Sequence, residues 1–368
     1  MMNRGGSEAM LMNIFRHIDR DKFKFFFLTH LPDAGAYDEE IKQLGGTFFF
    51  IPSLGTLGYA RYITTLYRFI REKGPFDIVH SHLDWQGGAI AVAARLAGVK
   101  NIIVHSHSSS WRKPDTLPYN MLHRFNRFLI ASCASECWAC SQEAGEFLFS
   151  QRLFKRGKYR KIRNAIDLDL YKNLTQESAL RMRQILGIPE KTLVLGHVGS
   201  FLKSKNQVFL IQIAVQLKKT NWDFRLVLVG DGAMRQEIED LVTTHGLSEQ
   251  VLFFGLRGDI PECMNMFDAF LFPSLYEGLG IAAIEAQAAG LPCLVSEYIP
   301  REVDMGLGLV SYLPLKSVER WIAALEDVRS RRCHLRSQID EQITIKGYNI
   351  RESVNEITSL YELICTKQ

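Results

Sequence analysis

Short apolar runs rich in Phe, Val, Ile and Leu alternate with longer segments of helical period along most of the chain, and this alternation constrains the fold more than any other feature. We interpret eleven of the runs as strands: residues 23–29, 46–52, 76–81, 101–106, 136–141, 158–166, 192–199, 224–230, 251–255, 269–273 and 292–296. Strands that alternate with helices predict βα units wound into parallel sheets. We therefore predict an α/β protein with doubly wound sheets.

A polar stretch without a strand, residues 167–191, separates the strands into two series. The 368 residues also exceed the size at which a single hydrophobic core keeps growing. We therefore predict two Rossmann-like domains, residues 1–168 and 169–349. Residues 350–368 carry apolar side chains at helical spacing, which predicts a closing helix that packs back on the first domain.

The composition argues against several classes of protein. The net charge is only +4, so we expect no nucleic-acid partner. No apolar run has the roughly 18 to 20 residues of a membrane-spanning helix, and the first residues lack the layout of a signal peptide. The seven cysteines are scattered along a large chain, which argues against a disulfide framework. Together these features predict a cytoplasmic protein.

The stretch SLYEGLGIAAIEAQAAGLP, residues 274–292, follows a predicted strand and carries the strongest chemical pattern. Gly278 and Gly280 leave the backbone open before an Ala-rich helix, so free N–H groups and the positive end of the helix dipole favour a phosphate there. Glu277 would repel a phosphate but would accept hydrogen bonds from sugar hydroxyls, and Glu285 is placed to hold a ribose. By spacing alone, a helix-start acid and a solvated glutamate explain the two residues equally well.

In this context the stretch resembles the E-x(7)-E signature of the family-four retaining glycosyltransferases, in particular the subgroup that builds bacterial exopolysaccharides. The segments NRGGSEAM, VHSHSS, ACSQEAGEFLF, VGSFLKSKN, LVGDG and VLFFGLRGDI follow in the order of that family. The resemblance covers most of the chain. It implies the GT-B fold, in which two Rossmann-like domains face each other across a cleft.

The resemblance also implies roles for residues of the second domain. Glu277 is expected to contact hydroxyls of the donor sugar, and Glu285 to bind the ribose. The amides of Gly278 and Leu279 are expected to meet the diphosphate. Lys205 matches the phosphate-binding lysine of the family, where a cation stabilises the charge that grows on the leaving nucleotide.

Two further groups of residues follow from the same resemblance. Gly255, Leu256 and Arg257 are expected to line the base of the nucleotide. His107, in the first domain, matches the histidine that the family places near the reacting sugar.

The sequence departs from the family pattern at two places. Many relatives carry an arginine where this chain has Ser200, and Lys203 is the candidate substitute because its flexible point charge can reach the same phosphate. Gly5 and Gly6 resemble the first glycine loop, which binds a phosphate of donor or acceptor, yet relatives have an apolar strand before it. We expect either a start codon assigned about nine or ten residues late, or a first domain with a gap beside its central strands.

Two H-x-H pairs, His80/His82 and His105/His107, end predicted strands and could assemble a metal site. A metal-dependent hydrolase that uses these pairs, with Asp84 as a further ligand, is therefore an alternative from another reaction class. That alternative does not explain the motifs in the second half of the chain.

The pairs Asp167/Asp169 and Asp19/Asp21 have the D-x-D form of metal-dependent glycosyltransferases of the other major fold. Neither ends a buried strand, and Asp is an ordinary turn former. We therefore expect no metal and no cofactor, because Lys205 and the helix start can offset the charge of the diphosphate.

Seven of the twelve residues in the range 152–163 are Lys or Arg. This run predicts either a solvated face or peripheral contact with an anionic membrane, where each basic residue contributes up to about 1 kcal/mol. Arg112 and Lys113 are candidates for contact with an acceptor pyrophosphate, and exposed charges that aid solubility are the alternative.

We therefore predict a metal-independent retaining glycosyltransferase. It would move a sugar from a nucleotide-diphosphate donor, in first place a UDP-sugar, to a lipid-linked saccharide during exopolysaccharide or capsule biosynthesis. The alternative with the same fold is a catalytically impaired nucleotide-sugar-binding protein, which Ser200 and the abrupt start would both favour.

Overall fold

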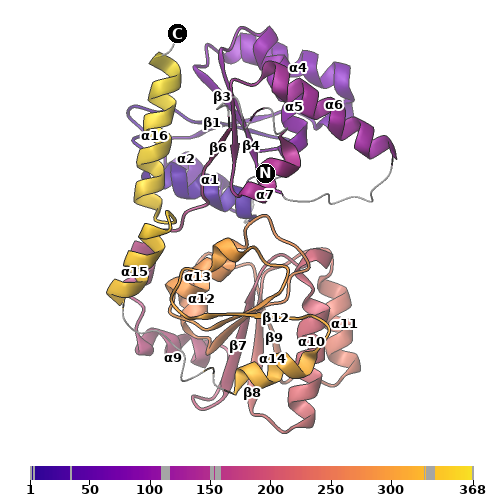
Figure 1. Cartoon of the computed structure of the whole chain (residues 1–368), viewed down its shortest axis with the longest axis vertical. Coiled ribbons are helices and arrows are strands. Elements are labelled where there is room, and N and C mark those ends of the chain that lie inside the picture. Colours follow the sequence, from indigo (N-terminus) through magenta and orange to yellow (C-terminus); the bar gives the residue numbers. More distant parts are fainter. Residues whose placement is uncertain are drawn as a thin grey trace. The chain divides into compact units, whose positions relative to one another are not determined.

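The computed structural model describes residues 2, 5–33, 35–108, 117–149, 153, 159–326, 328 and 336–366 (Figure 1). The chain divides into two compact units. Unit 1 contains Met1–Ala165 and Ile350–Gln368, and unit 2 contains Ile166–Asn349. The division thus falls next to Ala165, where the sequence analysis expected residue 168.

All eleven expected strands are present. The described strands are β1 (Phe26–Thr29), β2 (Thr47–Phe50), β3 (Ile78–Ser81), β4 (Asn101–Ser106), β5 (Glu136–Ala139), β6 (Tyr159–Lys161), β7 (Leu193–Val198), β8 (Phe224–Val229), β9 (Val251–Gly255), β10 (Ala269–Phe272), β11 (Cys293–Ser296) and β12 (Val310–Leu313). The last of these was not predicted. It is a short edge strand whose four residues are only half-buried.

Helices connect the strands throughout. The described α-helices are α1 (Gly6–His17), α2 (Asp38–Gln43), α3 (Leu54–Leu57), α4 (Tyr59–Lys73), α5 (Gly87–Leu96), α6 (Leu117–Cys133), α7 (Gln142–Leu148), α9 (Gln176–Ile185), α10 (Gln207–Lys219), α11 (Arg235–Thr244), α12 (Ile260–Asn265), α13 (Ile281–Ala288), α14 (Val318–Leu325), α15 (Arg336–Ile345) and α16 (Ile350–Thr366). The short 3-10 helices given by the described residues are η1 (Asp84–Gln86), η2 (Leu168–Tyr171), η3 (Lys203–Lys205) and η4 (Arg301–Val303).

Unit 2 is built on one six-stranded parallel sheet in the order β12-β11-β10-β7-β8-β9. Apolar side chains from α9, α12, α13 and α15 cover one face, and those from α10, α11 and α14 cover the other. Because both faces are covered, β10 and β11 are buried along their whole length. This is the doubly wound arrangement expected from the sequence.

Unit 1 contains two parallel sheets that are not hydrogen-bonded to each other within the described residues. One is the pair β1-β2, and the other has the order β3-β4-β5-β6. The rings of Phe26, on β1, and Phe76, just before β3, nevertheless lie 5.3 Å apart. The break in hydrogen bonding therefore falls between β1 and β3, and side chains span part of it.

Helix α16 returns to unit 1 and packs on α1 (Figure 1). Its buried residues Ile357 and Tyr361 join one apolar cluster with Phe15 of α1 and Phe27 of β1. The apolar residues whose spacing predicted a closing helix therefore form the face of α16 that completes this core.

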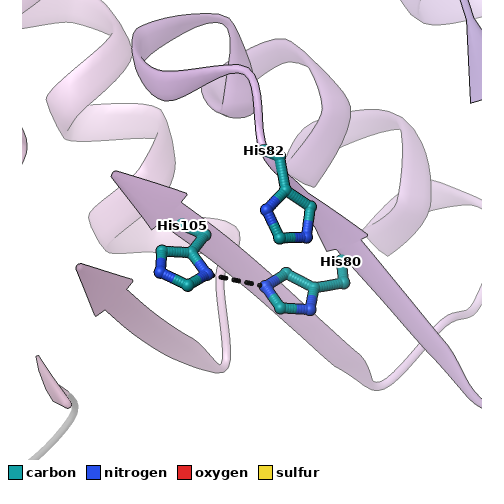
Figure 2. A group of neighbouring side chains, drawn as sticks. All are labelled: His80, His82 and His105. Atoms are coloured by element: carbon teal, nitrogen blue, oxygen red, sulfur yellow. Dashed lines mark hydrogen bonds between the residues drawn. The ribbon is translucent and has the colours of Figure 1, made fainter. Parts of the chain in front are cut away.

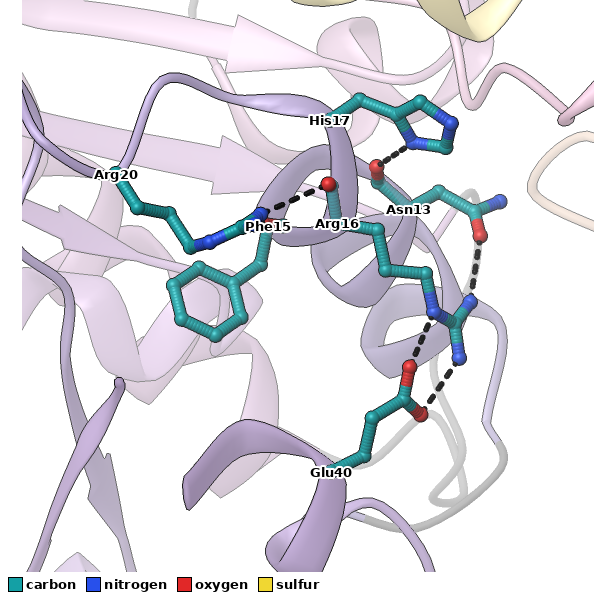
Figure 3. A network of polar contacts seen from close by, with 6 residues as sticks. All are labelled: Asn13, Phe15, Arg16, His17, Arg20 and Glu40. Atoms are coloured by element: carbon teal, nitrogen blue, oxygen red, sulfur yellow. Dashed lines mark hydrogen bonds and ion pairs between the residues drawn. The ribbon is translucent and has the colours of Figure 1, made fainter. Parts of the chain in front are cut away.

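Polar contacts hold the last turns of α1 in place (Figure 3). The Arg16 guanidinium donates to both carboxylate oxygens of Glu40 on α2, with Nε–Oε1 at 2.6 Å and Nη2–Oε2 at 2.8 Å. Arg16 also donates to Asn13 Oδ1, and Arg20 donates to the carbonyls of Phe15 and Arg16. Such a bidentate, partly exposed pair contributes about 1 kcal/mol.

Candidate active site

The candidate donor site lies in unit 2, where the loops that follow β7 and β10 meet at the carboxyl ends of the strands. The backbone N–H of Leu275 donates to the carbonyl of Ser204 at 2.8 Å, and the Asn206 side chain donates to the carbonyl of Pro273 at 3.2 Å. These two contacts join the loops around η3 and before α13. In open α/β sheets this edge is where ligands bind.

A glycine allows the loop after β8 to approach the same place. Gly230 has a φ of +136°, and a Cβ atom there would lie 2.1 Å from the carbonyl oxygen of Gly199. Its N–H donates to the carbonyl of Gly255 at the end of β9. The loops after three neighbouring strands are therefore held against one another by backbone contacts.

Lys205 and Glu277, two residues with predicted catalytic roles, form an ion pair with each other. Lys205 Nζ lies 2.6 Å from Glu277 Oε1 and 2.7 Å from Oε2, and the two side chains are 21% and 10% exposed. The ammonium also lies 5.6 Å from the ring centre of Phe272. From the sequence, the two residues were expected to contact different parts of a donor, so their direct pairing is new.

His197 lies on β7, next to this site, and was not predicted from the sequence. It is fully buried on β7, with Nδ1 2.9 Å from the carbonyl oxygen of Leu271 and Nε2 3.3 Å from the Gln207 side chain. Burial lowers the pKa of His197 to about 4, so the ring is neutral. A histidine inside an otherwise apolar strand was the available signal.

The backbone before α13 has the open form expected from its glycines. Gly280 is the N-terminal cap and has a φ of +95°, a region that favours glycine. Gly278 is half-buried, whereas the Leu279 side chain is buried in the core of unit 2. The role of the two amides at a diphosphate stays a prediction.

Glu285 lies in the second turn of α13 and is half-buried. Burial raises the pKa of its carboxyl to about 7. A carboxyl whose pKa is raised by burial is stabilised by hydroxyl donors, which is compatible with the ribose role implied by the resemblance.

The segment expected to line the base begins where β9 ends. Gly255 has a φ of +68°, and Leu256 is 56% exposed. Arg257 donates to both oxygens of Asp259, at 2.8 Å and 2.5 Å, and its guanidinium stacks on Phe254 at 4.4 Å. The structure thus leaves an apolar side chain, rather than the Arg257 charge, open to a ligand.

Ser200 and Lys203 lie on the same loop as Lys205. The carbonyl of Ser200 accepts a hydrogen bond from the Gln207 side chain at 3.0 Å, and the Lys203 side chain is exposed. Whether Lys203 replaces the arginine of other family members stays a prediction.

His107 belongs to a cluster of four histidines in unit 1, at the carboxyl ends of β3 and β4. His82 Nδ1 lies 2.9 Å from His107 Nε2. His105 Nδ1 lies 3.3 Å from His80 Nε2, a contact drawn in Figure 2. Burial lowers the pKa of all four rings, that of His107 to about 4, so the rings are neutral. The role of His107 near a reacting sugar stays a prediction.

Asp84, suggested from the sequence as a metal ligand, instead positions the loop that carries His107. Its carboxylate accepts hydrogen bonds from the His107 N–H at 2.6 Å and from the Ser108 hydroxyl at 2.9 Å. Among the described residues, the group that could hold a metal ion consists of His80, His82 and His105.

The glycine pair of the first loop lies at the start of α1 in unit 1. Gly5 is the cap residue, with a φ of −92°, and Gly6 is the first helical residue. Neither conformation requires glycine. The phosphate role of this pair stays a prediction.

The two D-x-D pairs form turns. Asp19 accepts hydrogen bonds from the N–H groups of Asp21 and Lys22, and Asp167 caps η2 by accepting one from Asp169. The turn interpretation is therefore confirmed. Arg112, Lys113 and half of the run 152–163, residues 152 and 154–158, lie outside the described residues.

A pocket of about 500 Å³ occurs at the opposite end of the unit 2 sheet. It is lined by residues that precede β7 and β10, among them Glu190 and Asp268, together with residues of α9 and α15. It does not include Lys205, Glu277 or Glu285, so it is separate from the candidate donor site. None of the described helices has the length and apolar composition that a membrane crossing requires.

Two family models match the chain. The model described as "Glycosyltransferase Family 4" matches residues 4–170, and that described as "Glycosyl transferases group 1" matches residues 179–305. The chain is 40% identical over 372 residues to the putative glycosyltransferase EpsF of Bacillus subtilis, covering 100% of this chain and 95% of the relative.

A second relative is the UDP-Gal:alpha-D-GlcNAc-diphosphoundecaprenol alpha-1,3-galactosyltransferase of Escherichia coli, 27% identical over 85% of this chain and 83% of its own length. Among solved structures, Anabaena HepE in complex with UDP and glucose has a TM-score of 0.77 at 20% identity, covering 98% of this chain and 97% of its own. Sucrose-phosphate synthase of Thermosynechococcus elongatus has a TM-score of 0.78 at 18% identity, covering 99% and 94%.

The chain therefore belongs to the family-four glycosyltransferases and has the GT-B fold. It is a glycosyltransferase, which removes the support for a hydrolase built on the histidine pairs.

Proposed function

We propose that this glycosyltransferase transfers a sugar, with retention at the anomeric carbon, from a nucleoside-diphosphate sugar to a lipid-linked saccharide in polysaccharide assembly. The observation that carries the proposal is the Lys205–Glu277 pair beside the amino end of α13. A cation, a helix start and a carboxylate at one strand edge provide partners for a diphosphate and for sugar hydroxyls.

The pair suggests how donor binding begins. Without donor, Lys205 is neutralised by Glu277. A diphosphate is a doubly charged competitor for the ammonium, so its arrival releases the Glu277 carboxylate to accept hydrogen bonds from sugar hydroxyls. The ion pair thus keeps both groups positioned until the donor exchanges partners with them.

The chemical step requires little acid–base chemistry from these residues. The bond from the anomeric carbon to the β-phosphate oxygen breaks, and a bond to the acceptor hydroxyl oxygen forms on the same face. The acceptor proton passes to the leaving phosphate. Lys205 stabilises the growing negative charge, so we propose that transfer needs no metal ion.

The donor and acceptor classes are proposed from relatives. The name of the E. coli relative states a UDP-linked donor and a diphosphoundecaprenol acceptor, and another relative is named for capsular polysaccharide biosynthesis in Staphylococcus aureus. We accordingly propose a UDP-sugar donor and an acceptor on a lipid diphosphate.

An exposed apolar stripe on α6 supports peripheral membrane contact by unit 1. Met121, Phe125 and Phe128 are 64%, 50% and 65% exposed and lie on one helical face, beside the exposed Arg124. Changing the three apolar residues to Ser is expected to lower co-sedimentation with anionic vesicles at least several-fold. Leu96→Ser, a single exposed apolar residue of α5, is the control, and equal binding of both variants would refute this surface.

The transfer proposal is tested by single substitutions of the ion pair. Lys205→Ala and Glu277→Gln are each expected to lower turnover on the order of 10²- to 10³-fold, because each removes a partner of the donor. Lys219→Ala, an exposed lysine at the end of α10, is the matched control and should keep full turnover.

Two outcomes would contradict the proposal. Retention of turnover by both site variants would move the site elsewhere. Thermal stabilisation of the unchanged protein by UDP-sugars, without transfer or hydrolysis for any sugar and lipid-linked acceptor tested, would favour an impaired binding protein.

A further inference from the structure

Three histidines of unit 1, His80, His82 and His105, have no role in the proposed transfer chemistry and lie beside His107. His80 and His82 come from the end of β3, and His105 from the end of β4, which is its hydrogen-bonded neighbour. Figure 2 shows the three imidazoles gathered beside one another at these two strand ends. The ring of Trp138, on β5, packs against His80 at 4.9 Å and closes one side.

We propose that His80, His82 and His105 bind one divalent transition-metal ion, Zn²⁺ in first place, which fastens the end of β3 to β4. The proposal is independent of the sugar-transfer reaction.

The distances between ring nitrogens suit a metal ion. One ligand nitrogen from each of the three rings can be chosen so that all lie within 4.8 Å of one another. His80 Nε2 and His105 Nδ1 are 3.3 Å apart. Two nitrogen ligands of a tetrahedral zinc ion, at about 2.0–2.1 Å from the metal, lie about 3.3–3.4 Å apart. The ligand nitrogen of His82 lies within 4.8 Å of the other two and would have to move closer to complete the site.

The outer contacts orient the rings as ligands. His80 Nδ1 lies 2.8 Å from the hydroxyl of Tyr361 on α16. If this nitrogen carries the proton and donates it to the hydroxyl, the Nε2 lone pair points at His105. An outer partner that fixes the tautomer in this way accompanies most metal-binding histidines.

The cluster also contains unsatisfied polar atoms. His105 Nε2 and His107 Nδ1 are buried, and neither has a hydrogen-bond partner. Four neutral rings have both donors and acceptors to satisfy, and they face mainly each other and aromatic carbon. Bonds within the described residues therefore leave the polar atoms of the cluster incompletely satisfied, although neither of these two atoms is a ligand nitrogen named above.

The ligand chemistry selects the class of metal. The three ligands are imidazoles, and the nearby Asp84 carboxylate is held by His107 and Ser108. Mg²⁺ and Ca²⁺ prefer oxygen ligands, whereas Zn²⁺, Co²⁺, Ni²⁺ and Cu²⁺ accept imidazole. We therefore expect the site not to bind the Mg²⁺ that accompanies nucleotides.

The position gives the ion a structural task. Within the described part of the chain, strand β3 is the edge of the four-stranded sheet and has a hydrogen-bonded neighbour on one side only. A metal that joins His80 and His82 to His105 would cross-link this edge to β4. Through Tyr361 it would also connect to α16.

Metal titration of the full, tag-free chain tests the proposal. After stripping with a chelator, the protein is expected to take up one equivalent of Zn²⁺ or Co²⁺ and to melt at a higher temperature with it. Bound Co²⁺ should show the visible absorption of a tetrahedral nitrogen site. Mg²⁺ should neither bind nor stabilise.

Variants locate the ion. His80→Gln and His105→Gln should each weaken Co²⁺ binding at least 100-fold, whereas His17→Gln, a partly exposed histidine on α1 outside the cluster, should bind as the unchanged protein does. Circular dichroism shows whether each variant is folded. Failure of the unchanged protein to take up a stoichiometric ion would overturn the proposal whatever the variants do, and so would undiminished binding by folded His105→Gln.

Discussion

The two units hold their parallel strands together in different ways. Unit 2 joins all of its strands into one six-stranded sheet, whereas unit 1 has a pair and a four-stranded sheet without hydrogen bonds between them in the described chain. In unit 1, aromatic side chains and α16 supply cohesion that backbone ladders supply in unit 2. Phe15, for example, packs on Phe25 and Phe27 at 5.2 Å and 5.1 Å, and α16 covers the same cluster. The stability of unit 1 should therefore depend more on individual side chains than the stability of unit 2 does.

The largest effect is expected from the helix that completes unit 1. Ile357 is fully buried on α16, so Ile357→Ala should lower the free energy of unfolding by about 2–5 kcal/mol. Hydrogen exchange should quicken in β1 and β4 and stay unchanged in β7 and β8. Ile345→Ala, at a residue 67% exposed on α15, is the control. Equal acceleration in both units would show that they do not unfold separately.

A smaller effect, confined to unit 2, should follow from its close backbone packing. A Cβ atom on Gly196, in β7, would lie 1.9 Å from the ring of Phe267. Gly196→Ala should therefore destabilise unit 2 by about 1–3 kcal/mol. Gly55→Ala, in α3 of unit 1, would place its Cβ in ordinary contact with Ser53 Oγ at 3.7 Å and should be nearly neutral. Thermal melts followed by hydrogen exchange would assign each loss of stability to its unit. If Gly196→Ala left the stability unchanged, this difference between the units would be refuted.

The smallest effect concerns the carboxyl of Glu285. Its pKa is raised to about 7 in the folded protein, from 4.5, so the folded state holds a proton that the unfolded state has lost between these values. Stability should therefore fall as the pH rises from about 4.5 to 7. Glu285→Gln should remove this decline. Because the side chain is partly exposed and solvent screens its charge, we expect the substitution to raise the stability of unit 2 at pH 8 by only about 1–2 kcal/mol. Denaturant titrations at pH 5 and pH 8 measure it, and a pH-independent difference between the two proteins would contradict the shift.

Much of the fold could be predicted because strand-forming runs are local in sequence. Strands β4, β7 and β8 coincide with predicted runs almost residue for residue. Strand β6 is shorter than predicted, Tyr159–Lys161 instead of 158–166, because the chain then leaves the sheet towards unit 2. Strand β12 was missed because pairing with β11, rather than its own sequence, makes it a strand.

The candidate site was predictable only in part. Lys205 and Glu277 were found through the family resemblance, yet their ion pair joins residues 72 positions apart and depends on how two loops fold together. Tyr361 lies 281 positions from His80, so no local pattern could connect them. His197 was overlooked because a buried neutral histidine has no spacing that distinguishes it from the apolar residues around it.

The return of α16 to unit 1 also sets an order of events during synthesis. Ribosomes release the chain from its amino end, so every residue of unit 2 emerges before α16 does. Until then the apolar faces of α1 and β1 lack the cover that Ile357 and Tyr361 provide. Unit 2, although it lies later in the sequence, can therefore be the first to reach its final structure, and the nascent first half is the stretch that chaperones would meet with its hydrophobic surface still open.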